Sequence, residues 1–137
     1  MDTIKGPAKS QRLKVGGPLG VLLVIETPSL LLRMADVVRS VEGLRLVGSF
    51  SGVAQAVDWL VWDRAGWHFA FVDLALGASG DELVHRLLSQ PRPGTVVAVT
   101  DHLWREVREK CRALGVVELL EKGDVIAFRG YLEAKAQ

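Results

Sequence analysis

The sequence has little of what marks secreted, membrane-spanning or nucleic-acid-binding proteins. It contains one cysteine, Cys111, so an internal disulfide is excluded, and this scarcity favours a cytoplasmic protein. The longest dense apolar run, Val21 to Ile25, is the size of a strand, whereas a helix needs roughly 18 to 20 apolar residues to span a bilayer. Lysine and arginine number 17 and aspartate and glutamate 16, so net charge gives no argument for binding nucleic acid or a membrane.

The sequence also lacks metal-binding and phosphate-loop motifs. His68, His85 and His102 lie on different expected elements at no ligand spacing, so they predict no metal site. His102 follows Asp101, where a solvated helix start is favoured over a group that controls access to a site. Gly16-Gly17-Pro18 lacks the Lys-Ser/Thr pair that a phosphate loop requires.

Residues 1–19 differ in composition from the rest of the chain. The charged residues of this segment are Lys5, Lys9, Arg12 and Lys14 against Asp2. Glycine and proline are frequent there, and no apolar stretch has the length of a signal peptide. We expect a flexible basic tail that is solvated or, alternatively, available to an acidic partner. Residues 20–137 then form one domain of ordinary size.

From residue 20 onward, apolar runs alternate with helical repeats. The expected strands are 20–26, 44–50, 67–73, 95–100 and 116–120. Apolar residues at helical spacing follow each strand, and glycine or proline closes most of these helices. Five strand–helix units predict an α/β fold, a doubly wound parallel sheet with five helices, and suggest the flavodoxin-like strand order 2-1-3-4-5.

Several residues predict how the helices begin and which way they face. The polar residues with the types and positions of helix caps are Thr27, Ser79 with Glu82, Asp101 and Asp124. The residues expected to face inward on the second helix are Ala54, Val57, Leu60 and Val61. Trp59 and Trp62 flank that face, and we place them at the edge of the core rather than on a partner surface. Cys111 falls on the apolar side of its helix and is expected to be a small core residue.

Polar residues stand where the expected strands end. The run Phe69–Leu74 reads as a strand buried on both faces, and Asp73 comes at its carboxyl end. Glu26, Thr100 and Lys122 end or follow the first, fourth and fifth strands. Since the carboxyl ends of parallel strands meet at one edge, where open α/β sheets bind ligands, we expect these side chains to converge there.

These residue types suit a phosphoryl group on Asp73. A carboxylate can act as the nucleophile that forms an aspartyl-phosphate. Mg²⁺ takes oxygen ligands, a lysine supplies a point charge to phosphate oxygens, and a threonine hydroxyl donates to them. Taken singly, Asp73 also fits a turn or cap, Lys122 a solvated turn, and Thr100 an ordinary strand residue. The phosphoryl interpretation requires a carboxylate within reach of Lys122 and Thr100 that is not buried under packing.

The chain resembles a response-regulator receiver domain, the phosphoacceptor unit of two-component signalling, from about residue 21 to 132. The matching segments are VLLVIE with Glu26, FVDL with Asp73, AVT with Thr100 and LLEK with Lys122. Thr100 and Lys122 are 22 positions apart, which is the family's usual spacing. The segment DLALGASGDEL also resembles the family pattern DLxLPGxSGxEL.

The resemblance implies a signalling protein rather than an enzyme. Asp73 would be phosphorylated by a sensor histidine kinase or phosphotransferase. Glu26, Asp73 and the backbone carbonyl of Ala75 would hold Mg²⁺, and Thr100 and Lys122 would bind the phosphoryl oxygens. The resemblance also implies a contact surface for a downstream protein that the sequence does not identify, and is compatible with a homodimer. The residues on that surface would be Trp104, Arg105, Arg108 and Arg112.

The sequence departs from the family pattern in three places. Thr27 occupies the second acidic position, and a hydroxyl is a poorer Mg²⁺ ligand than a carboxylate, so we expect weak Mg²⁺ binding. A proline and one residue are missing after Asp73. Leu119 replaces the aromatic switch residue three positions before Lys122, so the usual inward-swinging ring is absent.

Three functional hypotheses follow from the sequence. The first is a stand-alone, partly degenerate receiver that is phosphorylated on Asp73, because few residues follow the last expected helix and leave no room for an output domain. The second is a pseudo-receiver, an interaction module with the same fold that is not phosphorylated. The third is a small flavin or nucleotide carrier, which would need a phosphate-binding loop after the first strand, where Glu26-Thr27-Pro28-Ser29 places an acidic residue.

Overall fold

The computed structural model describes residues 17–62 and 66–137, which form a parallel sheet of five strands flanked by helices. The strands are β1 (Leu19–Val24), β2 (Leu44–Phe50), β3 (Phe69–Asp73), β4 (Thr95–Thr100) and β5 (Glu118–Glu121). The helices are α2 (Pro28–Ser40), α3 (Val53–Trp62), α4 (Gly77–Leu88), α5 (Arg105–Leu114) and α6 (Val125–Ala136), with a 3-10 turn, η1 (Leu74–Leu76), after β3. The strand order β2-β1-β3-β4-β5 confirms the predicted flavodoxin-like, doubly wound fold. The ends of β1, β3 and β5 differ from the predicted ends by one or two residues.

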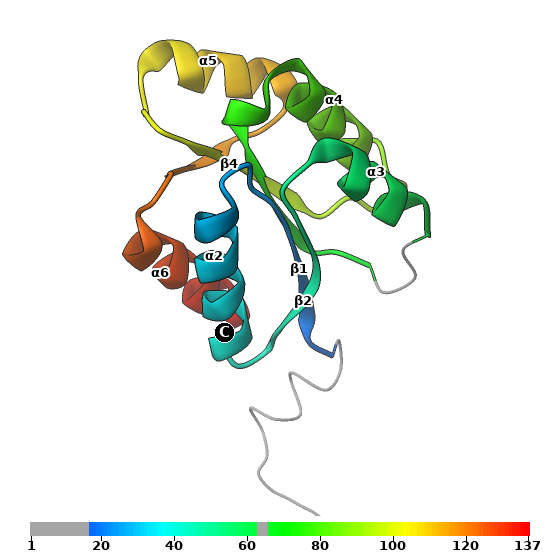
Figure 1. Ribbon diagram of the computed structural model, residues 1–137, viewed down its shortest axis with the longest axis vertical. Coiled ribbons are helices and arrows are strands. Elements are labelled where there is room, and N and C mark those ends of the chain that lie inside the picture. The colour runs from blue at the N-terminus through cyan, green and yellow to red at the C-terminus, as the bar shows by residue number, and fades with distance from the viewer. Residues whose placement is uncertain (1–16, 63–65) are drawn as a thin grey trace, which may run out of the picture.

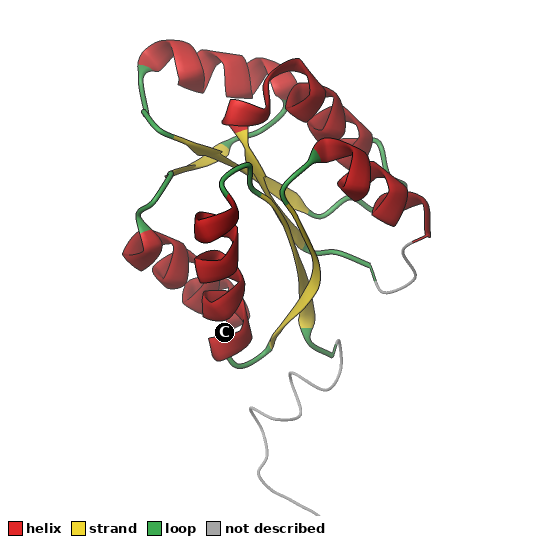
Figure 2. Cartoon of the chain, in the orientation of Figure 1, coloured by secondary structure: helices red, strands yellow, loops and turns green. Residues whose placement is uncertain are grey.

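Helices cover both faces of the sheet, as Figures 1 and 2 show. α2 and α6 lie together on one face, and α3, α4 and α5 lie on the other. Because side chains alternate along a strand, each central strand supplies residues to both layers. The strand residues packed on the α2–α6 face include Val21, Leu23, Phe69, Phe71, Val97 and Val99. Those packed on the α3–α5 face include Leu22, Val24, Ala70, Val72, Val96 and Ala98.

Aromatic side chains close the α2–α6 face. Phe71 of β3 is fully buried, and its ring centroid lies 4.9 Å from Phe128 and 5.7 Å from Tyr131, both in edge-on geometry. Edge-on pairs of this kind stabilise by more than the area they bury. They hold β3, the strand that ends in Asp73, against α6.

On the α3–α5 face, α4 is deeply packed through Leu83, Val84 and Leu87, whereas α3 and α5 are packed less deeply. Ala56 is the buried residue of α3 and Cys111 that of α5. The prediction that Cys111 is a core residue is confirmed, and burial raises the pKa of its thiol, which disfavours the reactive thiolate.

The predicted inward face of α3 is partly wrong. Ala54 is exposed and Val61 is 65% exposed, whereas Val57 and Leu60 are half-buried. Apolar residues surround most of this helix, so their spacing did not define one face. The orientation depends instead on Ala56, which is small enough to approach the sheet.

The two tryptophans of α3 have different environments. Trp59 is half-buried, and its ring lies 6.3 Å from that of Phe50 at the end of β2, as expected for the edge of the core. Trp62 is 72% exposed, so the same prediction is wrong for it. It lies in the last turn of α3, beyond the part of the helix that packs on the sheet.

Two of the predicted helix caps occupy their expected positions. Asp124 caps α6, and its carboxylate accepts a hydrogen bond from the Ala127 N–H at 3.0 Å. Thr27 is the N-cap residue of α2, and its carbonyl accepts from the Leu31 N–H at 2.9 Å. The Thr27 hydroxyl, however, makes no capping hydrogen bond, so a capping role does not account for this side chain.

The other two caps are wrong. α4 begins at Gly77, directly after η1, so Ser79 lies inside the helix and does not start a capping box. Asp101 is not the cap of α5, because that helix begins at Arg105 with Trp104 as the N-cap residue. In both places a short segment separates the strand from the helix: η1 before α4, and residues 101–104 before α5. The capping pattern does not predict these segments, so it places the helix start at the wrong residue.

The predicted basic tail spans residues 1–19. Residues 1–16 of it lie outside the part of the chain that the structure describes. Leu19 already belongs to β1, where its N–H donates to the Gly43 carbonyl at 2.9 Å, so the ordered domain begins before the predicted boundary at residue 20. Within the two described ranges, each helix is too short or too polar to cross a bilayer.

Candidate functional site

Asp73 is the last residue of β3 and the N-cap residue of η1. It continues the side-chain row of Phe69 and Phe71, and its neighbour across the sheet is Val99 of β4. The residue is 0% exposed. The sheet therefore presents one carboxylate at the carboxyl end of its central strand, at the bottom of the site rather than on the surface.

Three donors hold this carboxylate. Its Oδ2 accepts from the Lys122 ammonium at 2.8 Å and from the Glu26 N–H at 3.0 Å. Its Oδ1 accepts from the Ala75 N–H at 3.0 Å, which closes η1. A buried carboxylate is stable only when it is paired and hydrogen-bonded, and this one is both.

Lys122 reaches Asp73 from the turn after β5. Its N–H donates to the Thr100 carbonyl at the end of β4, at 2.6 Å. The next residue, Gly123, has a φ of +90°, a conformation that glycine adopts at little cost. The Lys122 and Asp73 side chains are 12% and 1% exposed, so their ion pair is nearly closed to water.

Thr100 lies beside this pair, but its hydroxyl is used elsewhere. Strand alternation puts Thr100 in the row of Val96 and Ala98, which pack on the α3–α5 face. The Thr100 hydroxyl donates to the His102 carbonyl at 3.2 Å and accepts from the His102 N–H at 3.4 Å. The predicted convergence therefore holds for Asp73 and Lys122, while the Thr100 hydroxyl is bound to the loop that leads into α5.

The residues predicted to bind Mg²⁺ form a sparse set of ligands. Glu26 follows β1, its side chain is exposed, and its backbone N–H bonds Asp73. Among residues 17–62 and 66–137, no three His, Cys, Asp or Glu side chains surround a point where a metal ion could be held. Mg²⁺ is often bound through only one or two carboxylates, with waters and phosphate completing its shell. Glu26 and Asp73 supply the carboxylate type that such a site uses, whereas Thr27 offers only a hydroxyl.

Leu119 takes the position where the family has its aromatic switch residue. It pairs with Ala98 across β4 and β5 and packs, half-buried, against the α3–α5 cluster. An aliphatic side chain wedged against that cluster has no ring to move in and out of the sheet edge.

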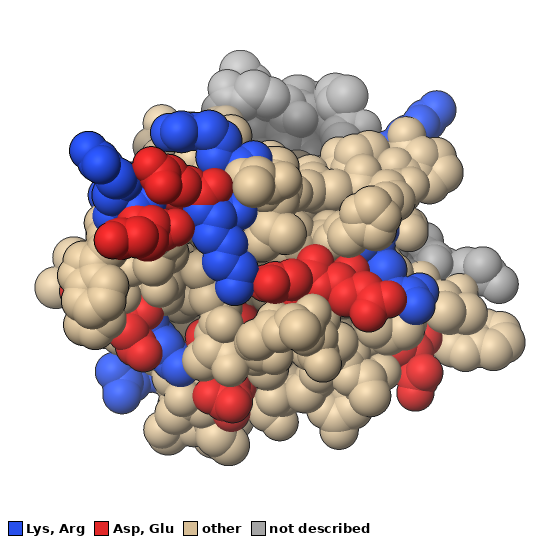
Figure 3. All heavy atoms as spheres, turned by 90° about the horizontal axis from the view of Figure 1, so that it is seen from above, with Lys and Arg blue, Asp and Glu red and all other residues tan. Residues whose placement is uncertain are grey.

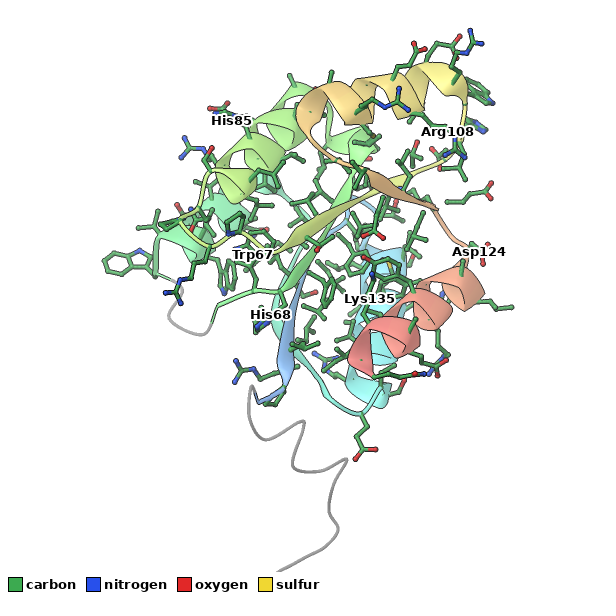
Figure 4. The ribbon with its side chains drawn as sticks, turned by 180° about the vertical axis from the view of Figure 1, so that it is seen from behind. Trp67, His68, His85, Arg108, Asp124 and Lys135 are labelled. Carbon is green, nitrogen blue, oxygen red and sulfur yellow. The ribbon has the colours of Figure 1, made fainter. Side chains whose placement is uncertain are left out.

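The predicted partner surface lies on α5 and the loop before it. Trp104 is 61% exposed, and Arg105, Arg108 and Arg112 are exposed as well. Arg108 stands beside the loop that enters α5, where its Nε donates to the Leu103 carbonyl at 3.2 Å (Figure 4). On the face drawn in Figure 3, acidic and basic side chains are interspersed, so no broad field of one sign covers it.

The loop before α5 contains a stacked pair of rings that the sequence does not predict. The rings of His102 and Trp104 are stacked, with centroids 4.3 Å apart and planes inclined by 3°. The sequence shows two aromatic rings separated by one residue, which by itself does not predict stacking. The backbone donors at Glu26 and Ala75 were equally invisible to sequence reasoning, because every residue except proline carries an N–H.

Two hollows lie away from this site, between α3 and α4. They have volumes of about 340 Å³ and about 240 Å³, and Val57 and Arg86 line both. Asp73, Thr100 and Lys122 line neither. The site at the sheet edge is thus defined by its polar contacts rather than by either of these hollows.

Comparison with known proteins gives a match in structure alone. No family model and no curated protein matches this sequence. A response regulator from Thermotoga maritima aligns with a TM-score of 0.69 at 17% identity, over 86% of this chain and 93% of that one. A response regulator receiver protein from Burkholderia phymatum aligns with a TM-score of 0.64 at 21% identity, over 82% and 95%.

A third structure, the phosphorylated cyanobacterial phytochrome response regulator RcpA, aligns with a TM-score of 0.69 at 14% identity, over 87% of this chain and 91% of that one. Identities this low establish the fold and leave the chemistry to be argued from the site. The strand order, the helix layers and these alignments agree that the chain has the fold of response-regulator receiver domains.

Proposed function

We propose that this protein is a receiver that accepts a phosphoryl group on Asp73 from a sensor histidine kinase or phosphotransferase and signals by changing its affinity for a protein partner. The observation that carries the proposal is the Asp73–Lys122 ion pair, at 2.8 Å, at the carboxyl end of the central strand. The same fold occurs in RcpA, a response regulator that has been observed in phosphorylated form. We propose that the surface through which it signals includes Trp104, Arg105, Arg108 and Arg112.

The transfer needs the site to open, because Asp73 is 0% exposed and does not meet the requirement, stated from the sequence, for a carboxylate that is not buried. A carboxylate oxygen of Asp73 attacks phosphorus, the new O–P bond forms, and the bond from phosphorus to the donor's nitrogen or oxygen breaks with its electron pair leaving on the donor. Lys122 has to release Oδ2 and can then pair with the phosphoryl oxygens. A bound Mg²⁺, held by Glu26, Asp73 and the Ala75 carbonyl, would supply charge neutralisation between the two anions.

Phosphorylation would change the charge of a nearly closed site. An aspartyl-phosphate places roughly two negative charges where one carboxylate was neutralised by Lys122. The donors now on Asp73, the N–H groups of Glu26 and Ala75, do not suffice for the added oxygens. Thr100, at the end of the neighbouring strand β4, is proposed as a further donor, and its hydroxyl would have to give up its hydrogen bond to the His102 carbonyl.

The test is phosphorylation by a small donor. The protein is incubated with acetyl phosphate and Mg²⁺, and intact mass and peptide mapping report whether one phosphoryl group is added at Asp73. Asp73→Asn removes the nucleophile and is expected to abolish the gain. The matched control is Asp101→Asn, an exposed aspartate in the loop after β4 whose loss is expected to leave the gain unchanged.

The second candidate is a pseudo-receiver, and two observations favour it. Asp73 has no exposed surface and is held by three donors, and Thr27 provides a hydroxyl where a carboxylate would bind Mg²⁺ better. Absence of any mass gain at saturating Mg²⁺ and donor would establish this candidate and reject the first.

Thr27→Asp sharpens the choice between the two candidates. A carboxylate at this position is expected to tighten Mg²⁺ binding by about tenfold or more and to speed phosphorylation, because Mg²⁺ prefers anionic oxygen ligands. Isothermal titration measures the affinity, and Thr27→Asn, similar in size but uncharged, is the control. An unchanged Mg²⁺ affinity would show that Thr27 does not lie beside the metal.

A further inference from the structure

Helix α3 has the composition of a buried helix but lies at the surface. Its ten residues are apolar except for Gln55 and Asp58. A helix that is apolar on all sides is normally covered on all sides. The structure buries Ala56 of α3 against the sheet, whereas Val61 is 65% and Trp62 is 72% exposed. Within the described ranges, the outer side of α3 is therefore left without the cover that its composition predicts.

A groove runs between α3 and α4, next to this exposed side. The two helices lie side by side on one face of the sheet, and they run in the same direction because both connect parallel strands (Figure 1). The hollows of about 340 Å³ and about 240 Å³ are the two halves of this groove, since Val57 and Arg86 line both. The lining residues from α3 are apolar, whereas most of those from α4 are polar or charged.

Two opposite charges stand near the middle of this surface. Asp58 of α3 is exposed, and its spacing puts it on the same side of the helix as Val61 and Trp62. Arg86 of α4 lies at the level of Asp58, where the two hollows meet, and its side chain is 52% exposed. The carboxylate of Glu82 lies 3.8 Å from Arg86, but exposed pairs of this kind are weak. The guanidinium of Arg86 can therefore exchange this carboxylate for one from another molecule.

We propose that a second copy of this chain covers the groove, with α3 of each copy lying on α4 of the other. A two-fold arrangement of this kind brings Asp58 of each copy to Arg86 of the other, so two ion pairs form at once. One helical turn further along, the same register places Trp62 over Ser89 and Gln90, which line the larger hollow of the second copy. Each indole then fills a hollow of the other molecule.

The self-complementarity of this surface favours a second copy over a different protein. The chain carries the projecting indole and the carboxylate on α3, and the receiving hollow and the guanidinium on α4. Its formal net charge is +1, so two copies repel each other only weakly. The inference depends neither on phosphorylation of Asp73 nor on the proposed signalling surface of α5.

Sedimentation equilibrium of the full chain, from micromolar to near-millimolar concentration, measures the association. We expect a reversible dimer, and we expect Trp62→Ala to weaken it by about tenfold or more, because a buried tryptophan commonly dominates an interface. Trp104→Ala is the matched control, since Trp104 is 61% exposed on the opposite side of the α3–α5 layer, at the start of α5, and its loss is expected to change nothing. Thermal unfolding of each variant verifies that the fold is retained.

Exchanging the two charges tests the register. Asp58→Arg and Arg86→Asp each place like charges opposite one another in a homodimer, so each is expected to weaken the dimer by about tenfold or more. An equimolar mixture of these two variants restores both ion pairs between unlike copies, and we expect it to associate nearly as well as the wild type. Arg39→Asp, at an exposed position of α2, controls for the change in net charge.

A protein that is monomeric at every concentration would overturn the inference and leave the groove to a different partner. A dimer that Trp104→Ala dissociates and Trp62→Ala does not would place the contact on α5 and overturn it equally. If the mixture of the two charge variants associates no better than each variant alone, Asp58 does not meet Arg86 of the second copy, and the proposed arrangement is wrong. Recovery in the mixture supports it, because only pairing between copies produces that result.

Discussion

The two layers of helices on the sheet are built differently. The α2–α6 layer buries six residues of α2 and closes on the edge-packed rings of Phe71, Phe128 and Tyr131. The α3–α5 layer buries four residues of α4 but only one of α3 and one of α5, and it contains two hollows between α3 and α4. The first layer is a closed core, and the second is packed tightly at α4 and loosely at α3 and α5.

The site lies where the two layers meet, at the carboxyl end of the strands. Asp73 lies on the same side of β3 as Phe71, which packs in the closed layer, and Lys122 follows Leu120 of β5 on that side and pairs with Asp73. Thr100 lies on the same side of β4 as Ala98, which packs in the α3–α5 layer. A side chain beside α5 can change its hydrogen bonds with little repacking, so movement is expected on the α5 side while Asp73 itself stays fixed.

The largest expected effect tests the closed layer. Phe71→Ala removes a fully buried ring that contacts two others, and we expect it to lower the free energy of unfolding by about 3–5 kcal/mol. Val107→Ala, at a half-buried position of α5 in the α3–α5 layer, is expected to lower it by about 1 kcal/mol. Urea unfolding of both variants measures the difference. Equal losses would show that the two layers are packed alike and remove the contrast on which the expected movement depends.

The next effect tests the ion pair at the site. Lys122→Ala leaves the buried Asp73 carboxylate with two backbone donors and no cation, and we expect a loss of about 2–3 kcal/mol. Lys110→Ala is the matched control, because Lys110 pairs with Asp81 at 3.3 Å but is 46% exposed, and such pairs contribute about 1 kcal/mol or less.

Adding Asp73→Asn to Lys122→Ala removes the unpaired charge, so the double variant is expected to recover much of that stability. Chemical unfolding at neutral pH compares the four proteins. If Lys122→Ala is as mild as Lys110→Ala, the carboxylate is reached by water in solution, and the closed site described above is not the dominant state.

The fold was predictable because each strand and each inward helix face leaves a pattern in the residues themselves. The five buried runs predicted the strands, whereas the strand order came from the precedent of flavodoxin-like folds with five strand–helix units, because the residues themselves do not encode it. The meeting of Asp73 with Lys122 was predictable because parallel strands bring their carboxyl ends to one edge. These are consequences of the backbone and need no detail of side-chain packing.

What sequence reasoning missed depends on contacts that no local pattern records. The direction of the Thr100 hydroxyl depends on a four-residue loop whose carbonyl and N–H groups compete for it. The orientation of α3 depends on Ala56 because apolar residues surround most of that helix. The start of α4 depends on η1, a turn that Asp73 itself caps, so the carboxylate of Asp73 also determines local structure that the capping-box pattern did not predict.

The smallest expected effect is a change of the unfolding free energy with pH, which is compared for one titrating group in each layer. Tyr131, in the closed layer, donates to Glu118 at 2.6 Å; burial, and then this hydrogen bond, raise its pKa. The folded state therefore favours the neutral phenol. Its contribution to stability is present in full below the ordinary tyrosine pKa of about 10 and is lost as pH rises from there toward the higher pKa of the folded protein. Tyr131→Phe is expected to cost about 1 kcal/mol at neutral pH.

The difference in unfolding free energy between wild type and Tyr131→Phe is expected to shrink as pH is raised past about 10, because only the wild type has this phenol to ionise. Cys111, in the α3–α5 layer, also has a raised pKa, but it is present in both proteins and cancels in the difference. Unfolding midpoints recorded from neutral to alkaline pH give the profile, and Cys111→Ala measured in the same way isolates the thiol. A difference that stays constant with pH would mean that Tyr131 is solvated, and that the closed layer opens at its α6 edge.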